Sequence, residues 1–151
     1  RSIPLTELRR RVTVVDQAPF LLRASIAENL RLAAPDATDA QLWEALRVVD
    51  LDETVRAMPA GLDPSVGDRP VGQRHRLALA RALLHDGQVV IVDEGTGQLD
   101  EPTEQRVLDR VRSVWEDRTV VWITHRTATL SLCDSVVRVE DGRVISAQPV
   151  S

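Results

Sequence analysis

The sequence predicts an α/β fold, in which part of a parallel sheet is joined to a helical subdomain. Two apolar runs, VVIV at 89–92 and VVWITH at 120–125, have the composition of buried parallel strands. The first half of the chain instead carries helix-starting motifs and helical spacing. We therefore expect a single partial domain, with a helical subdomain at about 23–84 and an α/β core portion formed by residues 1–22 and 85–151.

The first half is expected to contain one strand followed by helices. Residues 12–15, VTVV, form the strand, and Ser25-x-x-Glu28 is a capping box that starts a helix through about Leu32. Thr38-x-x-Gln41 is a second capping box. The apolar residues that follow it fall on one helical face: Leu42, Trp43, Leu46 and Val49.

Further along, a short helix is expected at 52–58. The prolines and glycines of 59–71 predict a loop, and 72–85 predicts a strong amphipathic helix. The second half alternates strand and helix patterns. Its expected elements are a strand at 88–92, a helix from Pro102 to about Trp115, a strand at 119–124, a short helix after His125, and strands at 135–140 and 143–147 joined by an Asp141-Gly142 hairpin turn.

Functional side chains are expected where two of these strands end. The strand 89–92 runs into Asp93 and Glu94, and the run 120–125 ends in His125. Phosphate ligands bind at the carboxyl edge of parallel sheets, so acids and a histidine at this edge predict a nucleotide-hydrolysis site. A solvated turn is the alternative for an Asp-Glu pair, and the buried strand before it argues against that alternative.

The chain contains no lysine, because all 19 of its basic residues are arginines. A P-loop, G-x-x-x-x-G-K-[ST], requires a lysine that reaches the β- and γ-phosphates of the nucleotide. We therefore interpret the chain as the C-terminal part of a larger domain and expect it to be inactive alone. Such a part should also expose apolar surface on strand 89–92 or its neighbours.

Composition excludes several other classes. A net charge of −4 argues against a nucleic-acid-binding surface, which is usually basic. No apolar run reaches the roughly 18–20 residues that span a bilayer. The lone cysteine, Cys133, excludes an internal disulfide and is expected to be a small buried apolar residue.

Four motifs in order resemble the nucleotide-binding domain of ABC transporters of the exporter type, and the resemblance covers nearly the whole chain. The segment LRRRVTVVDQAPFLLRASIAENLRLA resembles the Q-loop region, and GLDPSVGD resembles the run before the signature motif. The segment GQRHRLALARALLHDGQVVIVDEGTGQLD resembles the signature helix, Walker B strand and D-loop. VVWITHRTATL resembles the switch-histidine segment. The fold class implied is a partial P-loop NTPase core without the Walker A motif.

The resemblance implies a role for each matching residue. Asp93 matches a ligand of Mg²⁺, and Glu94 matches the general base that activates the attacking water. His125 matches the histidine that senses the γ-phosphate of ATP. Gln17 matches the glutamine that links Mg²⁺ and water to the helical subdomain, and Asp100 matches the D-loop aspartate that communicates across the dimer.

The signature motif departs from the family pattern. The family sequence is Leu-Ser-Gly-Gly-Gln, and only Gly72 and Gln73 match it here. Pro70 offers neither an N–H nor a hydroxyl to a γ-phosphate, and Val71 adds a β-branched side chain where the backbone must approach closely. The signature is therefore expected to be weak. Three further residues replace the usual Ala, Ser and Ala near the D-loop: Gly95, Gly97 and Gln98.

The remaining histidines, His75 and His85, match no family role and are expected to be solvated helix residues. The implied whole is an exporter at the cytoplasmic face of the cell membrane. It would pair a transmembrane domain with two nucleotide-binding domains, in a heterodimer with one degenerate ATP site. A non-catalytic interaction or regulatory module is the alternative. An ATPase of DNA maintenance fits less well, because no basic patch is present.

Overall fold

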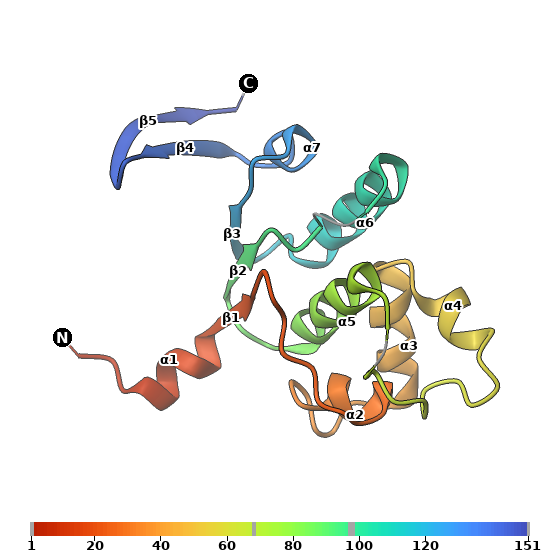
Figure 1. The fold of residues 1–151 in the computed structure, drawn as a ribbon. Coiled ribbons are helices and arrows are strands. Elements are labelled where there is room, and N and C mark those ends of the chain that lie inside the picture. Colours follow the sequence, from red (N-terminus) through yellow and green to blue (C-terminus); the bar gives the residue numbers. More distant parts are fainter. Residues whose placement is uncertain (1, 68, 97–98, 151) are drawn as a thin grey trace.

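The computed structural model describes residues 2–67, 69–96 and 99–150 (Figure 1). The helices are α1 (Leu5–Arg11), α2 (Ile26–Arg31), α3 (Asp39–Val48), α4 (Asp52–Arg56), α5 (Val71–Leu84), α6 (Glu101–Val114) and α7 (Thr127–Leu130). The strands are β1 (Val12–Val15), β2 (Val89–Asp93), β3 (Thr119–Ile123), β4 (Ser135–Glu140) and β5 (Arg143–Pro149). This order of elements confirms the predicted α/β class.

Strands β1, β2 and β3 form a parallel sheet with β2 at its centre. Val89 pairs with Val12 on one side and with Thr119 on the other, so all three strands run toward the same edge. The chain between β1 and β2 contains helices α2 to α5, which gather on one side of the sheet in Figure 1. A long crossover of this kind is what parallel pairing requires.

The two faces of the sheet differ in exposure. Val15, Val90 and Val92 are buried beneath the helices. Trp115, at the end of α6, lies beside Trp122 of β3, with ring centroids 6.4 Å apart and the rings tilted by 45°. On the other face the apolar side chains are uncovered: Val14 is 60% exposed, Val121 45% and Ile123 51%. The prediction of exposed apolar surface on the strands is thus confirmed.

The helices between β1 and β2 share a core of their own. Both predicted capping boxes are present: the Ser25 hydroxyl accepts from the Glu28 N–H, and the Thr38 hydroxyl accepts from the Gln41 N–H. Helix α5 packs against α2, α3 and β1, and it therefore joins this group of helices to the sheet. The fully buried leucines of the group are Leu30, Leu42, Leu46, Leu51, Leu77 and Leu79.

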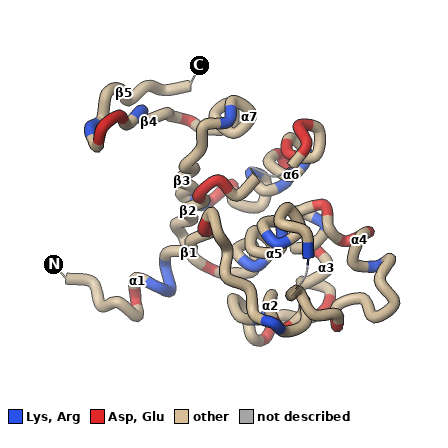
Figure 2. Tube along the Cα trace, viewed as in Figure 1, with Lys and Arg blue, Asp and Glu red and all other residues tan. Residues whose placement is uncertain are grey.

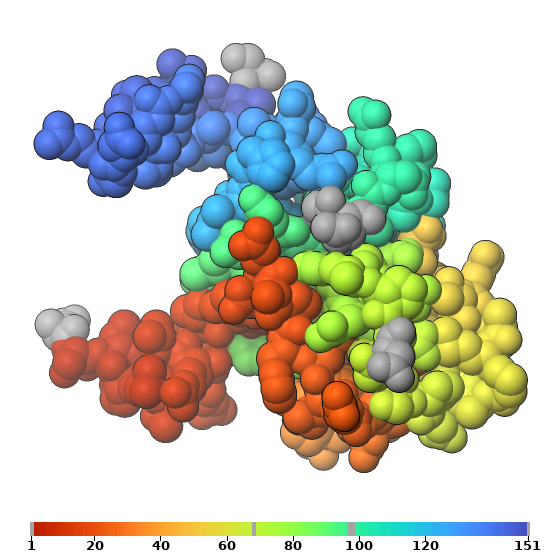
Figure 3. All heavy atoms as spheres, viewed as in Figure 1, coloured from red at the N-terminus to blue at the C-terminus, as the bar shows by residue number. Residues whose placement is uncertain are grey.

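Two elements extend from the body. Strands β4 and β5 form the predicted hairpin, in which Asp141 and Gly142 adopt φ angles of 48° and 72°, as a tight turn of this kind requires. Helix α1 was not predicted. Figure 3 shows α1 and the hairpin projecting on the same side of the molecule with open space between them. Among the described residues, no helix has the length and apolar character needed to cross a membrane.

Asp50 joins three helices at the end of α3, where it has a left-handed φ of 59°. Its carboxylate accepts from Arg106 Nη2 at 2.9 Å and from Arg110 Nη1 at 3.2 Å, both on α6. Its backbone carbonyl accepts from Arg76 Nη1 of α5 at 2.7 Å. The hydrogen bond from Arg106 is the largest cause that holds the pKa of Asp50 below its ordinary value.

We predict that Asp50→Asn destabilises the chain in a pH-dependent way. Asparagine tolerates a positive φ, so the change removes mainly the charge. Because the pKa of Asp50 is lower folded than unfolded, its stabilisation is complete above the unfolded value and is lost as pH falls through the folded value. Urea unfolding should show a loss of about 1 kcal/mol at pH 7.

That loss should shrink as pH falls below the ordinary aspartate pKa of 3.8. Asp36→Asn is the matched control, because Asp36 is exposed and forms no ion pair with the described residues. A loss for Asp50→Asn that stays constant with pH would contradict a charge effect and would point to the backbone instead.

Candidate functional site

Glu94 lies one residue beyond β2, at the carboxyl edge of the sheet. Figure 2 shows acidic residues in red beside β2. Its backbone N–H donates to the Ile123 carbonyl at 3.0 Å, which extends the β2–β3 pairing by one hydrogen bond. Its φ of 50° is unusual for a residue with a side chain. This turn ends the strand and directs the carboxylate along the sheet edge. Non-glycine residues with such angles cluster at functional sites.

The Glu94 carboxylate is held between side chains from the two neighbouring strand ends. Gln17 Nε2, two residues after β1, donates to Glu94 Oε2 at 3.0 Å. His125 Nδ1, two residues after β3, lies 3.1 Å from Glu94 Oε1. The Glu94 side chain is 34% exposed and that of His125 is 79% exposed. The structure therefore brings together three of the predicted site residues, with the histidine open to a ligand.

Asp93 is the last residue of β2 and pairs with Ile123. Its half-buried carboxylate makes no hydrogen bond or ion pair with any described residue, although it stands beside Glu94. Within the described ranges, no group of three or more His, Cys, Asp or Glu residues could hold a metal ion. Mg²⁺ takes only one or two protein carboxylates together with water and phosphate oxygens. An uncommitted Asp93 fits such a partial ligand set.

The other predicted site residues lie elsewhere. Gly72, Gln73 and Asp100 line a pocket of about 440 Å³ between the start of α5 and the start of α6. The Asp100 carboxylate caps α6 by accepting from the Thr103 N–H at 3.1 Å. Hydrogen bonding to Thr103 holds the pKa of Asp100 below its ordinary value. The site residues thus form two groups, one at the sheet edge and one around this pocket.

The structure at the start of α5 agrees with the prediction that the signature motif is weak. Pro70 occupies the N-cap position, and no side chain caps the helix there. Val71, the first helical residue, is 53% exposed. Gln73 accepts from Arg69 Nη1 at 3.3 Å. The helix end therefore presents an apolar side chain where serine would offer a hydroxyl donor and glycine would allow phosphate to approach the backbone closely.

His75 and His85, which were predicted to be solvated helix residues, are partly exposed and also make specific contacts. His75 Nε2 lies 2.5 Å from the Gln17 carbonyl oxygen, and its Nδ1 lies 3.0 Å from the Val71 carbonyl oxygen. His85 Nδ1 contacts the Thr13 hydroxyl and accepts from the Gly87 N–H. His75 therefore ties α5 to the Gln17 segment. The sequence carried no local signal for this contact, which joins residues 58 positions apart.

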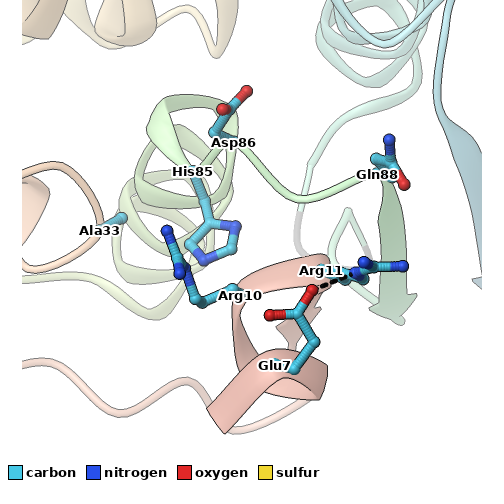
Figure 4. A pocket seen from close by; sticks show the side chains of 7 residues that line it. All are labelled: Glu7, Arg10, Arg11, Ala33, His85, Asp86 and Gln88. Atoms are coloured by element: carbon cyan, nitrogen blue, oxygen red, sulfur yellow. Dashed lines mark hydrogen bonds and ion pairs between the residues drawn. The ribbon is translucent and has the colours of Figure 1, made fainter. Parts of the chain in front are cut away.

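A larger pocket, of about 550 Å³, contains none of the predicted site residues (Figure 4). It lies beside α1 and the segment that leads into β2, and its lining includes Arg10, His85 and Gln88. Gln88 precedes β2, so this pocket is at the amino edge of the sheet. Ligands of open α/β sheets bind at the opposite, carboxyl edge, where Glu94 lies.

A partial parallel sheet with a carboxylate and a histidine at its carboxyl edge, joined to a helical crossover, defines an α/β nucleotide-binding class. Comparison with known proteins gives the family within that class. The sequence profile of the ABC transporter family matches residues 2–97, and the chain belongs to this family. The solved structure of an ABC exporter, described below, places it among nucleotide-binding domains of the exporter type, as the sequence predicted.

Individual relatives are also named as ATP-binding proteins. The chain is 37% identical over 145 residues to the heterocyst differentiation ATP-binding protein HepA of Nostoc sp., covering 93% of the chain and 24% of HepA. It is 42% identical over 137 residues to a mitochondrial potassium channel ATP-binding subunit of Xenopus tropicalis, covering 86% of the chain and 20% of that protein.

Among solved structures, a bacterial Atm1-family ABC exporter with ATP bound matches with a TM-score of 0.89 and 28% identity. The match covers 95% of this chain and 26% of the exporter chain. The chain therefore spans about a quarter or less of the length of these relatives.

The packing around Gly95, the residue after Glu94, leaves no space for a side chain. A Cβ at Gly95 would lie 2.5 Å from Val92 Cγ1, and Val92 is fully buried in β2. The alanine usual in the family thus has no room in this chain. The other two departures near the D-loop, Gly97 and Gln98, lie outside the described residues.

We predict that Gly95→Ala lowers the free energy of unfolding by about 1–3 kcal/mol, because the new methyl group displaces Val92. Gly67→Ala is the control, since its Cβ would meet its nearest neighbour at an ordinary 3.7 Å. On a Val92→Ala background the cost of Gly95→Ala should largely disappear in denaturant unfolding. Equal costs on both backgrounds would show that the clash is not responsible.

Proposed function

We propose that this chain supplies the water-activating and γ-phosphate-sensing half of an ATP-hydrolysing site in an ABC exporter. The observation that carries the proposal is the position of Glu94, held at the sheet edge between Gln17 and His125. The phosphate-binding lysine would come from the Walker A motif of the complete domain, because this sequence contains no lysine.

Glu94 acts as the general base in this proposal. It accepts a proton from a water molecule as the water oxygen bonds to the γ-phosphorus of ATP. The bond from that phosphorus to the β–γ bridging oxygen breaks, and the electron pair leaves with ADP. The hydrogen bond from Gln17 and the contact with His125 fix the orientation of the carboxylate, so that little reorganisation is needed.

Asp93 and Gln17 would hold Mg²⁺, which neutralises charge on the β- and γ-phosphate oxygens when it is bound. Asp93 is suited to this role because no described residue engages its carboxylate. Gln17 donates through Nε2 to Glu94, which leaves its amide oxygen to face a cation. His125, with its side chain 79% exposed, is accessible for a contact with the γ-phosphate.

Gln17 also offers a route from the site to the helices. The backbone carbonyl oxygen of Gln17 contacts the His75 side chain of α5, and α5 packs against α2 and α3. Residues 23–84 would then move as a helical subdomain relative to a core portion formed by 1–22 and 85–151. When the groups bound to the Gln17 side chain change, the resulting movement would pass through α5 to this subdomain. A membrane domain in contact with the subdomain would then move with it.

The complete protein is proposed to work at the cytoplasmic face of the cell membrane. There it would combine a transmembrane domain with two nucleotide-binding domains. The weak signature at the start of α5 favours a heterodimer, because Pro70 has neither an N–H nor a hydroxyl and the exposed Val71 side chain hinders close approach of a partner's ATP. The ATP site that uses Glu94 would be completed by the partner's signature, and the other site would be degenerate.

Glu94→Gln in the complete transporter should abolish steady-state ATP hydrolysis, with a loss of about 10²-fold or more, since the amide cannot accept the proton. Binding of ATP should persist, because the change leaves the other site residues in place. Phosphate release and nucleotide binding by the purified, lipid-reconstituted protein measure the two effects. Glu116→Gln, at an exposed position, is the control. Hydrolysis by Glu94→Gln at the wild-type rate would refute the proposed function.

The heterodimer is tested by isolating the complete protein from its native membrane and identifying the copurified subunit by mass spectrometry. We expect a second ABC chain with an intact Leu-Ser-Gly-Gly-Gln signature. A partner whose own signature is broken would refute the arrangement, since neither ATP site would then be complete. Recovery of this chain paired only with itself would also refute it.

A further inference from the structure

Glu104 is a buried carboxylate that the proposed chemistry does not use. It lies in the first turn of α6 and is 1% exposed. A buried carboxylate is costly unless both of its oxygens have partners. Glu104 Oε1 accepts from the Thr96 hydroxyl at 2.6 Å, and Glu104 Oε2 is 2.5 Å from Arg126 Nη2.

The two partners of Glu104 belong to different strand ends. Thr96 follows Glu94 by two residues, and Arg126 follows His125 directly. The backbone bond from the Glu94 N–H to the Ile123 carbonyl extends the β2–β3 pairing to Glu94. Beyond that point, the contacts of Glu104 with Thr96 and Arg126 hold the two segments together. Thr96 is 3% exposed, so water competes little for its bond to Glu104.

We propose that Glu104 is a positioning residue, which sets the separation of Glu94 and His125 by holding the segments that follow them. This inference rests on the proposed function. The contact of 3.1 Å between Glu94 and His125 is made by two partly exposed side chains, which do not fix their own spacing. The link through Glu104 is buried, because Glu104 is 1% exposed and Thr96 is 3% exposed. A shift of the two segments relative to one another would separate the base from the phosphate-sensing histidine.

The charge of Glu104 is the property to test. Glu104→Gln keeps the size of the side chain and an acceptor for Thr96, but it removes the charge that faces Arg126. Glu104→Asp keeps the charge on a side chain shorter by one methylene. If Glu104 positions the site through its ion pair with Arg126, Glu104→Asp should retain more ATP hydrolysis than Glu104→Gln.

The decisive experiment measures kcat and KM for ATP hydrolysis, together with the melting temperature, in the complete transporter. Glu104→Gln should lower kcat by about tenfold and change KM for ATP less than twofold. Glu104→Asp should recover part of the lost kcat. Leu108→Ala, a buried change in the same helix, is the control for destabilisation alone. It should lower the melting temperature while keeping kcat near that of the wild type.

Equal losses of kcat in Glu104→Gln and Leu108→Ala would overturn the inference, because Glu104 would then contribute only stability. Wild-type kcat in Glu104→Gln would overturn it as well. If Glu104→Gln does not accumulate, Thr96→Val tests the other half of the link with little change in shape, and a wild-type kcat there would count against it. The proposed function fails separately, if Glu94→Gln hydrolyses ATP normally.

Discussion

The site depends on the parallel pairing of β2 with both of its neighbours. This pairing sends β1, β2 and β3 to one edge of the sheet, where Gln17, Glu94 and His125 then meet. The positive φ of Glu94 is costly for a residue with a Cβ, but the bond from its N–H to the Ile123 carbonyl offsets part of that cost. A slip of one residue in the register would turn the side chains of β2 to the opposite face and dissolve the cluster.

The elements that the sequence predicted well are those whose signals are local. Capping boxes, apolar strands and the Asp141-Gly142 turn each lie within a few residues, so physical rules at short range sufficed. Helix α1 was missed because it buries none of its residues and so leaves no apolar stripe. Its observed support is electrostatic: Glu7 pairs with Arg11 at 2.7 Å, one turn apart.

The site residues also fall into those that local sequence signals predicted and those that they did not. The residue types at the strand ends pointed to Asp93, Glu94 and His125, whereas Gln17 and Asp100 entered only through the family resemblance. The contacts of His75 and Glu104 had no sequence signal, because a histidine on a helix and a glutamate in a first turn are usually solvated. Burial of Glu104 depends on where Thr96 and Arg126 come to lie, which only the three-dimensional arrangement specifies.

The contrast between the two groups of site residues has a physical basis. At the sheet edge, Gln17 and His125 contact the Glu94 carboxylate without any ligand, so this part of the geometry is already formed. At the start of α5, Pro70 removes an N–H and Val71 exposes an apolar side chain. Electrostatic catalysis gains from fixed polar groups, and phosphate binding requires free donors. Under the proposed function, this chain would act on a phosphate that other residues bind, and the start of α5 would be poorly suited to bind the phosphate of a partner's ATP.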